Sequence, residues 1–388
     1  MKIAHMKPGM INRTIEFIKT LYKDEEFVPL HAPRFWGHEK KYTADCIDST
    51  FVSSVGKFVD EFEKKCAAYC GAKYAVAAVN GTAALHMALV LKGIGVGDGV
   101  ITQPLSFVAT ANAIHYTGAQ PVFVDVDRDT MSLSPDKLEQ FLKTEVVLQQ
   151  GVACHKLSGL KLRACIVMHT LGHPGRVVEL RKICDLWGLV LIEDAAESMG
   201  SFLSGRHVGT FGTMGVLSFN GNKIITTGGG GMLLFNDEAL ARQAKHLTTT
   251  AKIPHPWEYA HDAVGYNYRM PNLNAALGLA QLEQLDKFLV SKRVVAETYK
   301  QFFVKEDVEF VCEPIDAASN YWLNAIILKD RGERDAFLEA TNKAKVMTRP
   351  LWKLLNTLNP YQRSFKTNLD NAQWLEDRVV NIPSSVAR

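Results

Sequence analysis

Short apolar runs alternate with helix-like segments from residue 74 onward, and this alternation limits the possible folds of the chain more than any other feature. The runs are 74–79, 99–102, 121–125, 164–169, 189–193, 214–219 and 232–235. Apolar runs of this length, separated by helical patterns, are typical of strands joined by parallel crossovers. We therefore predict an α/β fold with one large, mostly parallel sheet of seven strands.

The flanking segments have other patterns. We expect helices at 11–22, 39–49, 58–69, 273–299 and 334–343, and a strand at 321–328. The polar stretch 143–161 is expected to be an inserted hairpin or excursion. The stretch 248–268, rich in Pro, His and aromatic residues, is expected to be a long functional loop.

The chain has 388 residues, more than one typical hydrophobic core requires. We expect a large α/β domain at 1–250, which includes the N-terminal helical segment. We expect the linking loop, a long helix and a small α+β domain at 251–388. No internal repeat is visible.

Composition excludes several classes of partner. The net charge is +3 and no basic tract is present, so neither nucleic acid nor a membrane surface is expected as a partner. No apolar run reaches transmembrane length and the first residues lack the apolar core of a signal peptide, so a cytoplasmic protein is expected. The seven cysteines are scattered without a C-x-x-C pair, which favours reduced core residues.

One lysine stands out because of its neighbours along the chain. Lys223 comes after the apolar run 214–219 and shortly before the four glycines 228–231. Glycine permits positive φ and a close backbone approach, so the amine faces a crowded wall without side chains. Such a lysine can form a Schiff base with a flat aldehyde cofactor. The alternative is a solvated lysine in a surface loop.

Four other sites along the chain, comprising five residues, offer matching chemistry, each with an ordinary alternative. Gly81 and Thr82 join a strand to a helix, where free N–H groups can bind an anion and Thr82 can cap. Asp194 ends a buried strand, where a carboxylate can stabilise a ring N–H or can simply cap a helix. Phe107 can stack on a flat ring or belong to the core, and Ser218 can donate to a phosphate or be satisfied locally.

Rival motifs are weaker. The glycine-rich stretch 93–99 follows a helix and precedes a strand, the reverse of a dinucleotide loop. Neither a G-x-x-x-x-G-K-[ST] loop nor a G-x-S-x-G elbow occurs. His169 with His173, and Cys154 with His155, lack acidic or thiol partners at metal-ligand spacing, so no metal site is expected.

Taken in order, six spaced motifs resemble those of the DegT/DnrJ/EryC1/StrS sugar aminotransferases. They are Gly81-Thr82, Phe107, Asp194 with Glu197, Ser218, Lys223 and the glycines 228–231. The resemblance extends from Phe51 to Arg349. It implies the fold type I of aspartate aminotransferase, pyridoxal 5′-phosphate (PLP) as cofactor, and homodimers with shared active sites.

The resemblance also assigns roles. Lys223 would form the Schiff base and move the proton, Asp194 would pair with the pyridine nitrogen, and Phe107 would stack on the ring. The phosphate would be held by Gly81, Thr82, the amide of Ala83, Ser218 and Asn267 of the partner subunit. Glu197 would lie near the 3′-oxygen, where many relatives have glutamine. A carboxylate there repels that oxygen unless it is protonated or turned aside.

The resemblance further implies a reaction. A minority branch with histidine in place of Lys223 performs dehydration, so lysine implies transamination. The segments 52–59, 219–228, 247–252 and 319–324 resemble enzymes that aminate nucleotide-linked 4-keto-6-deoxy sugars with glutamate as donor. The expected substrate is UDP-2-acetamido-2,6-dideoxy-4-ketohexose, on the way to bacillosamine or legionaminic acid in polysaccharide biosynthesis.

Two alternatives stay open: a GDP-4-keto-6-deoxymannose aminotransferase of the perosamine type, and a non-catalytic PLP-binding regulator. Candidates for contact with the sugar or diphosphate, each with an ordinary structural role also available, are Ser54, His169, Arg269, Tyr321 and Arg349.

Overall fold

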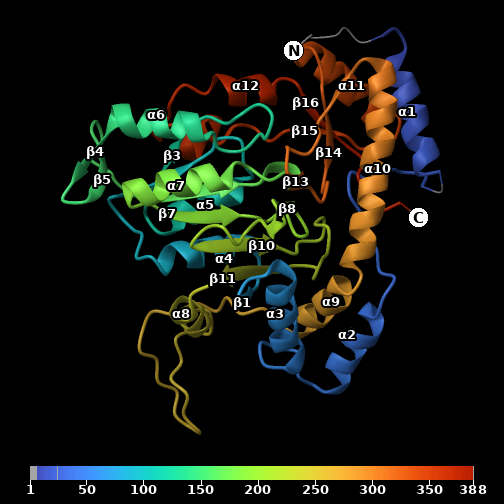
Figure 1. Cartoon of the computed structure of the whole chain (residues 1–388). Coiled ribbons are helices and arrows are strands. Elements are labelled where there is room, and N and C mark those ends of the chain that lie inside the picture. The colour runs from blue at the N-terminus through green and yellow to red at the C-terminus, as the bar shows by residue number, and fades with distance from the viewer. Residues whose placement is uncertain (1–6, 24, 388) are drawn as a thin grey trace.

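The computed structural model describes residues 7–23 and 25–387, and its central feature is a large mixed sheet (Figure 1). The seven predicted strands are all present as β1 (Tyr74–Ala78), β2 (Asp98–Thr102), β3 (Gln120–Phe123), β6 (Lys161–Met168), β7 (Val190–Asp194), β10 (Met214–Ser218) and β11 (Gly231–Phe235). Their spatial order is β1-β11-β10-β7-β6-β2-β3. Strands β10, β7, β6, β2 and β3 run parallel, whereas β11 is antiparallel to β10 and β1. The predicted mostly parallel α/β sheet is confirmed.

The stretch predicted as a hairpin or excursion is a hairpin. Strands β4 (Val146–Gln149) and β5 (Val152–His155) pair antiparallel, and β5 also pairs with the start of β6. These two strands bring the sheet to nine. The hairpin therefore extends the sheet at the start of β6, whereas ligands in such sheets bind at the carboxyl ends of the strands.

Helices cover both faces of the sheet because successive strand residues point to opposite sides. Val100 belongs to a core with α4 (Gly81–Val90), α5 (Val108–Tyr116) and α8 (Glu238–Thr248), whereas its neighbour Ile101 packs with α6 (Pro135–Glu145) and α7 (Val177–Trp187). A third core joins β10 and β11 to α3 (Lys57–Cys70) and α9 (Asn272–Leu282), and α2 (Glu39–Asp48) packs on α9.

The C-terminal part forms a second, antiparallel sheet. Its strands, in spatial order, are β12 (Glu309–Phe310), β14 (Asn324–Ile327), β16 (Val379–Ile382) and β15 (Arg349–Pro350). The remaining short elements are β8 (Phe202–Leu203), β9 (Arg206–His207), β13 (Ala317–Ala318), the 3₁₀ turns η1 (Thr170–Gly172), η2 (Leu355–Thr357) and η3 (Asn359–Tyr361), and α12 (Asp370–Glu376).

The N-terminal helix packs with this second sheet. Ile18 of α1 (Met10–Leu21) lies in one core with Tyr299, Phe303 and Phe337, which come from α10 (Leu285–Glu306) and α11 (Arg331–Lys343). Figure 1 shows α1 beside α10, away from the large sheet. The division at residue 250 stays a prediction, but α1, predicted with the large domain, packs with the C-terminal elements.

The single helix predicted at 273–299 is wrong, because the structure has two helices. Helix α9 ends at Leu282 and α10 begins at Leu285. Glu283 at the junction contacts His38 and Tyr42, at 3.0 and 3.1 Å, so it is held by the α2 side of the molecule. Packing against two different layers therefore overrides the continuous helical pattern.

The stretch 248–268 forms an arm that projects from α8 (Figure 1). After the last residue of α8 the arm contains no helix, and its two sides are joined by isolated bridges at Thr249 with Asn267 and at Lys252 with His261. Trp257 and Tyr259 at its far part are 76% and 81% exposed. Among the described residues, no helix combines the length and hydrophobicity needed to cross a membrane.

Candidate active site

A pocket of about 320 Å³ lies where the parallel strands of the large sheet end and α4 begins. Its lining residues include the ends of β7 and β10 and the first turn of α4: Asn80, Gly81, Thr82, Leu85, Phe107, Ala109, Met168, Asp194, Ala196, Glu197, Ser218, Asn220, Asn222, Lys223, Trp322 and Trp352. Carboxyl ends of parallel strands are the usual ligand sites of open α/β sheets. The pocket has the volume of a small-molecule site.

Lys223 enters the pocket from a tight turn after β10, in which its N–H donates to the carbonyl of Asn220 at 3.0 Å. Its Nζ lies 3.4 Å from Glu197 Oε1 and 4.0 Å from the centre of the Trp322 ring. The side chain is 13% exposed. The amine is thus held between a carboxyl and an aromatic face, largely away from water.

The glycines after Lys223 allow β11 to lie against the start of α4. A Cβ on Gly231 would lie 2.5 Å from the carbonyl carbon of Asn80, and Gly228 has a φ of 80°. Side chains at these two positions would push the strand away from the pocket floor or strain the turn. The close backbone approach expected from the sequence is therefore present.

Asp194 is the last residue of β7, and its carboxylate is fixed on both oxygens. Thr110 Oγ1 donates to Oδ2 at 2.7 Å, and the N–H of Ala196 donates to Oδ1 at 3.2 Å. Burial raises the pKa of this carboxyl, while the bond from Thr110 and the nearby Lys223 act in the opposite direction. A buried, oriented carboxylate of this kind can hold a proton on a ring nitrogen.

The pKa of Glu197 is shifted further from its ordinary value than the pKa of Asp194. Its side chain is 1% exposed, and the N–H of Leu171 donates to Oε2 at 2.9 Å. Burial raises the pKa of this carboxyl to about 7, against the lowering effect of Lys223. The pocket therefore contains two buried carboxyls beside one amine, a pattern typical of catalytic sites.

The start of α4 supplies an anion site, with one change from the prediction. The cap of α4 is Asn80, whose Oδ1 accepts the N–H of Ala83 at 2.8 Å, so Thr82 is not the capping residue. Thr82 and Ser218 both line the pocket, and a Cβ on Gly81 would lie 3.1 Å from the Cβ of Ser218. Two hydroxyl side chains at a helix N-terminus suit a phosphate.

A scan against family models matches residues 36–387 to the DegT/DnrJ/EryC1/StrS aminotransferase family. The chain belongs to this family. The GDP-perosamine synthase of Escherichia coli O157:H7 is 37% identical over 359 residues, which are 92% of this chain and 93% of that protein. EpsN of Bacillus subtilis (strain 168), whose name describes a pyridoxal phosphate-dependent aminotransferase, is 39% identical over 360 residues, 92% of this chain and 90% of EpsN.

Solved structures give the same assignment. The aminotransferase TlmJ from Streptoalloteichus hindustanus superposes with a TM-score of 0.84 at 28% identity, covering 92% of this chain and 93% of TlmJ. The fold is therefore that of fold-type I PLP enzymes, as predicted. This DegT-family protein is a PLP-dependent aminotransferase, and the alternative of a non-catalytic regulator has no support in these names.

The residues present fit PLP. One pocket contains a largely buried primary amine, a fixed carboxylate at Asp194, the half-exposed ring of Phe107 and hydroxyl groups at a helix N-terminus. These four groups match the aldehyde, ring nitrogen, ring face and phosphate of the cofactor. The amide of Ala83, predicted to hold the phosphate, is instead bonded to Asn80.

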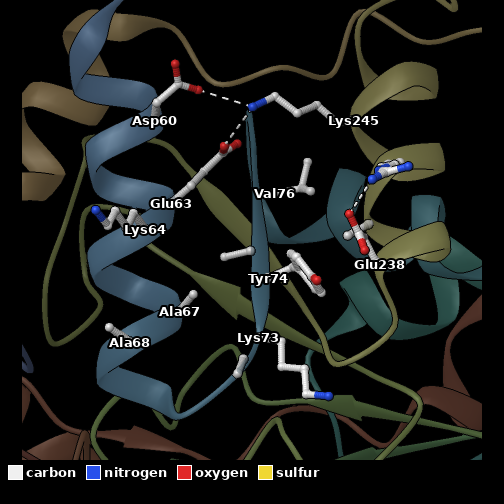
Figure 2. Close-up of a pocket in the computed structure, with 14 residues that line it drawn as sticks. Asp60, Glu63, Lys64, Ala67, Ala68, Lys73, Tyr74, Val76, Glu238 and Lys245 are labelled. Atoms are coloured by element: carbon white, nitrogen blue, oxygen red, sulfur yellow. Dashed lines mark hydrogen bonds and ion pairs between the residues drawn. The ribbon is translucent and has the colours of Figure 1, made fainter.

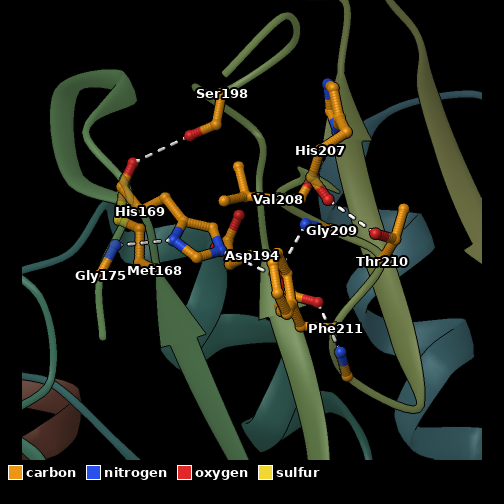
Figure 3. A network of polar contacts seen from close by, with 12 residues as sticks. Met168, His169, Gly175, Asp194, Ser198, His207, Val208, Gly209, Thr210 and Phe211 are labelled. Atoms are coloured by element: carbon orange, nitrogen blue, oxygen red, sulfur yellow. Dashed lines mark hydrogen bonds and ion pairs between the residues drawn. The ribbon is translucent and has the colours of Figure 1, made fainter. Parts of the chain in front are cut away.

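His169, a predicted substrate contact, does not line the pocket. Its ring is fully buried, with Nε2 3.0 Å from Glu193 Oε2, and Nδ1 accepts the N–H of Gly175 at 3.0 Å (Figure 3). Glu193 also accepts the N–H groups of Gly209 and Gly212 at 2.7 and 2.6 Å. This network lies behind Asp194 and braces the ends of β6 and β7.

The other predicted contacts also lie outside the pocket lining of the single chain. Tyr321 is buried, with its hydroxyl accepting the N–H of Glu313 at 3.2 Å, and Arg269 is buried with Nη1 3.0 Å from Glu63 Oε1. Ser54 is half-buried in the loop between α2 and α3, while Arg349 and Asn267 are exposed. Their roles, including the contribution of Asn267 to a partner's site, stay predictions.

The lining residues that the sequence analysis did not predict include Trp322, Trp352 and Asn222. Trp322 follows the predicted Tyr321 directly, and its Nε1 donates to the carbonyl of Asn222 at 2.7 Å. The aromatic segment was recognised, but which of two neighbouring aromatic residues faces the site depends on the backbone direction. Tyr321 has a φ of 48°, a turn that the sequence pattern did not indicate.

A second hollow, of about 490 Å³, lies between α3, β1 and α8 (Figure 2). Lys245 reaches across it, with Nζ 3.1 Å from Asp60 Oδ1 and 3.3 Å from Glu63 Oε2. Glu63 also accepts the N–H of Ala77 at 2.9 Å, on the edge strand β1. Side chains that occupy an exposed strand edge prevent other chains from pairing with it.

Proposed function

We propose that this protein transfers an amino group from glutamate to C4 of a GDP-linked 4-keto-6-deoxy sugar, with GDP-4-keto-6-deoxymannose as substrate. The observation that carries the proposal is the pocket around Lys223, in a chain that is 37% identical over nearly its whole length to a protein named GDP-perosamine synthase. The UDP-linked sugar expected from the sequence, with the bacillosamine or legionaminic pathway, has no such support. EpsN, which is 39% identical, has a name that does not specify a sugar.

When bound, PLP would supply an electron sink and a carrier for the amino group. Lys223 would hold the cofactor, and its Nζ would remove and return the proton at the reacting carbon of the substrate. Asp194, held by Thr110, would keep a proton on the ring nitrogen. Phe107 would lie against the ring, and Thr82 and Ser218 would bind the phosphate.

The aromatic side of the pocket suits the sugar. Trp322 and Trp352 line it together with the amide side chains of Asn220 and Asn222. Small-molecule sites commonly combine aromatic walls with a few polar groups that fix orientation. We expect these residues, together with the predicted contacts from the partner subunit, to orient C4 toward the bound amine.

The proposal includes a homodimer. The arm at 248–268 projects from the body with Trp257 and Tyr259 exposed, and Asn267 lies at its base. Exposed aromatic residues gathered on a projecting segment are typical of a protein interface. A second copy would cover the arm and complete the phosphate site with the partner subunit's Asn267. Light scattering measures the state, and a purely monomeric active enzyme would contradict this part.

The test of the substrate is a paired assay. The purified protein with PLP and glutamate is offered GDP-4-keto-6-deoxymannose and UDP-2-acetamido-2,6-dideoxy-4-ketohexose, and the aminated products are quantified by mass spectrometry. We expect the higher kcat/KM with the GDP sugar. A higher value with the UDP sugar would overturn the proposed substrate and leave the transaminase assignment intact.

A further inference from the structure

Glu197 has a geometry that the assigned reaction does not explain. It lies three residues after Asp194, and its two oxygens have separate partners. Oε2 accepts the N–H of Leu171 in η1 at 2.9 Å, and Oε1 lies 3.4 Å from Lys223 Nζ. The backbone carbonyl of Glu197 accepts a hydrogen bond from Asn320 Nδ2 at 2.8 Å. The carboxyl is therefore held facing the reacting amine and is not turned aside.

Charged groups from two elements and a backbone N–H from a third surround Glu197. Lys223 approaches from the turn after β10, Asp194 from the end of β7, and η1 contributes the Leu171 N–H. Behind Asp194 lie His169 and Glu193, which pair with each other at 3.0 Å. Burial is the largest influence on Glu197 and raises its pKa; Asp194 acts in the same direction, and Lys223 and Leu171 oppose it.

The chemistry of PLP determines what Glu197 meets. The aldehyde carbon must reach Lys223 Nζ, and the phenolic oxygen is on the neighbouring ring carbon. A group beside Nζ therefore lies close to that oxygen as well. The phenolic oxygen is negative when the ring nitrogen holds a proton, which Asp194 favours. A carboxylate at Glu197 would repel this oxygen, whereas a carboxylic acid would donate a hydrogen bond to it.

We propose that Glu197 holds a proton in the working site and donates a hydrogen bond to the phenolic oxygen of PLP, so that this carboxyl makes cofactor affinity depend on pH. The inference rests on the cofactor and is independent of the sugar nucleotide.

The sign of the effect is set by the two charge states. With a pKa of about 7 in the free site, Glu197 is a donor at lower pH and becomes a carboxylate as pH rises. The affinity for PLP therefore falls as pH rises above about 7. A glutamine at this position keeps an N–H donor at every pH, so Glu197→Gln removes the dependence without removing the hydrogen bond.

The test measures binding to the cofactor-free protein. The probe is 4-deoxypyridoxine 5′-phosphate, which has a methyl group in place of the aldehyde and cannot bond to Lys223. Its Kd is measured by calorimetry between about pH 6 and pH 9 for the wild type and for Glu197→Gln. We expect the wild-type Kd to rise about tenfold from pH 7 to pH 8.5 relative to the variant. Ionisation of the phosphate affects both proteins equally, so their ratio isolates Glu197.

Two further measurements decide the outcome. The 3-deoxy analogue of the probe lacks the phenolic oxygen, and with it the two proteins should have the same pH profile. A difference that persists with this analogue, or identical profiles with the first probe, would overturn the proposal. If the variant does not fold, the carbonyl infrared band of the protonated acid is titrated in the wild type alone. Bound probe should raise the pKa of that acid, and an unchanged or lower pKa would overturn the proposal.

Discussion

Two lysine–carboxylate pairs in this protein have almost the same separation and different surroundings. Lys223 lies 3.4 Å from Glu197 in the pocket, and Lys245 lies 3.3 Å from Glu63 in the hollow beside β1 (Figure 2). The side chains of the first pair are 13% and 1% exposed, whereas Lys245 is 49% exposed and Glu63 is 8% exposed.

The two carboxyls differ in the number of hydrogen-bonding and positively charged groups that contact them. Glu63 accepts hydrogen bonds from the Ala77 N–H and Lys245 and forms an ion pair with Arg269, three groups that stabilise its negative charge. Glu197 has one backbone N–H and Lys223, and its burial raises its pKa to about 7. A short distance between opposite charges therefore does not identify a reactive pair. The cost of removing the groups from water, set against the donors supplied, decides whether the protons can move.

The largest effect is expected from Lys223→Ala. The variant has no amine to bind the cofactor or to move the proton, so turnover should fall on the order of 10⁴-fold or more. Lys223→Arg is the matched control, since it keeps a positive charge beside Glu197 but cannot condense with an aldehyde. Product assays and the visible absorption band of the bound cofactor measure both. Turnover by either variant near the wild-type rate would contradict the role of Lys223.

A smaller loss is expected from Asp194→Asn, which keeps the shape and removes the negative charge opposite the ring nitrogen. Loss of one oriented electrostatic partner typically lowers kcat by about 10²- to 10³-fold. Thr110→Val is the control, because it removes the 2.7 Å bond to Asp194 and leaves the carboxylate in place. Single-turnover kinetics with glutamate should give the order wild type, Thr110→Val, Asp194→Asn. The reverse order of the two variants would be evidence against an electrostatic role.

Glu197→Gln should change how stability depends on pH. The pKa of Glu197 is near 7 in the folded chain, above its ordinary 4.5, so the folded state binds the extra proton between these values. The stabilisation is fully present below pH 4.5 and is lost as pH rises through 7. Relative to the variant, the cofactor-free wild type should lose about 3 kcal/mol of unfolding free energy across this range. Urea unfolding at a series of pH values measures the difference, and parallel profiles would mean that Glu197 is already ionised at low pH.

Much of the fold could be predicted because its signals are local. Each of the seven predicted strands of the large sheet is a short apolar run buried over most of its length, so its residues reveal it without knowledge of its neighbours. The break between α9 and α10 could not be predicted. The residues at 283 and 284 are ordinary helix formers, and the interruption arises from packing on two different layers.

The sequence predicted those site residues whose place at or after the end of a strand determines where their side chains lie. Asp194 and Ser218 end parallel strands, and Lys223 and the glycines follow one of them, so all converge at one edge of the sheet. Trp322 and Trp352 come from the C-terminal part, and no local pattern indicates that they reach this edge. His169 also ends a run, but its direction into the bond with Glu193 depends on the neighbouring strand.

The smallest effect is expected from Lys245→Ala, which removes the lysine of the more exposed pair. Half-exposed ion pairs contribute roughly 0 to 1 kcal/mol, since water already solvates the lysine well. Glu63 would keep the Ala77 N–H and Arg269, so its charge would stay compensated. Thermal unfolding should therefore shift only slightly, by less at high salt than at low salt, and kcat should stay within about twofold. A large loss of turnover in Lys245→Ala would mean that the hollow beside β1 takes part in the reaction. Burial would then not distinguish the reactive lysine–carboxylate pair from the other pair.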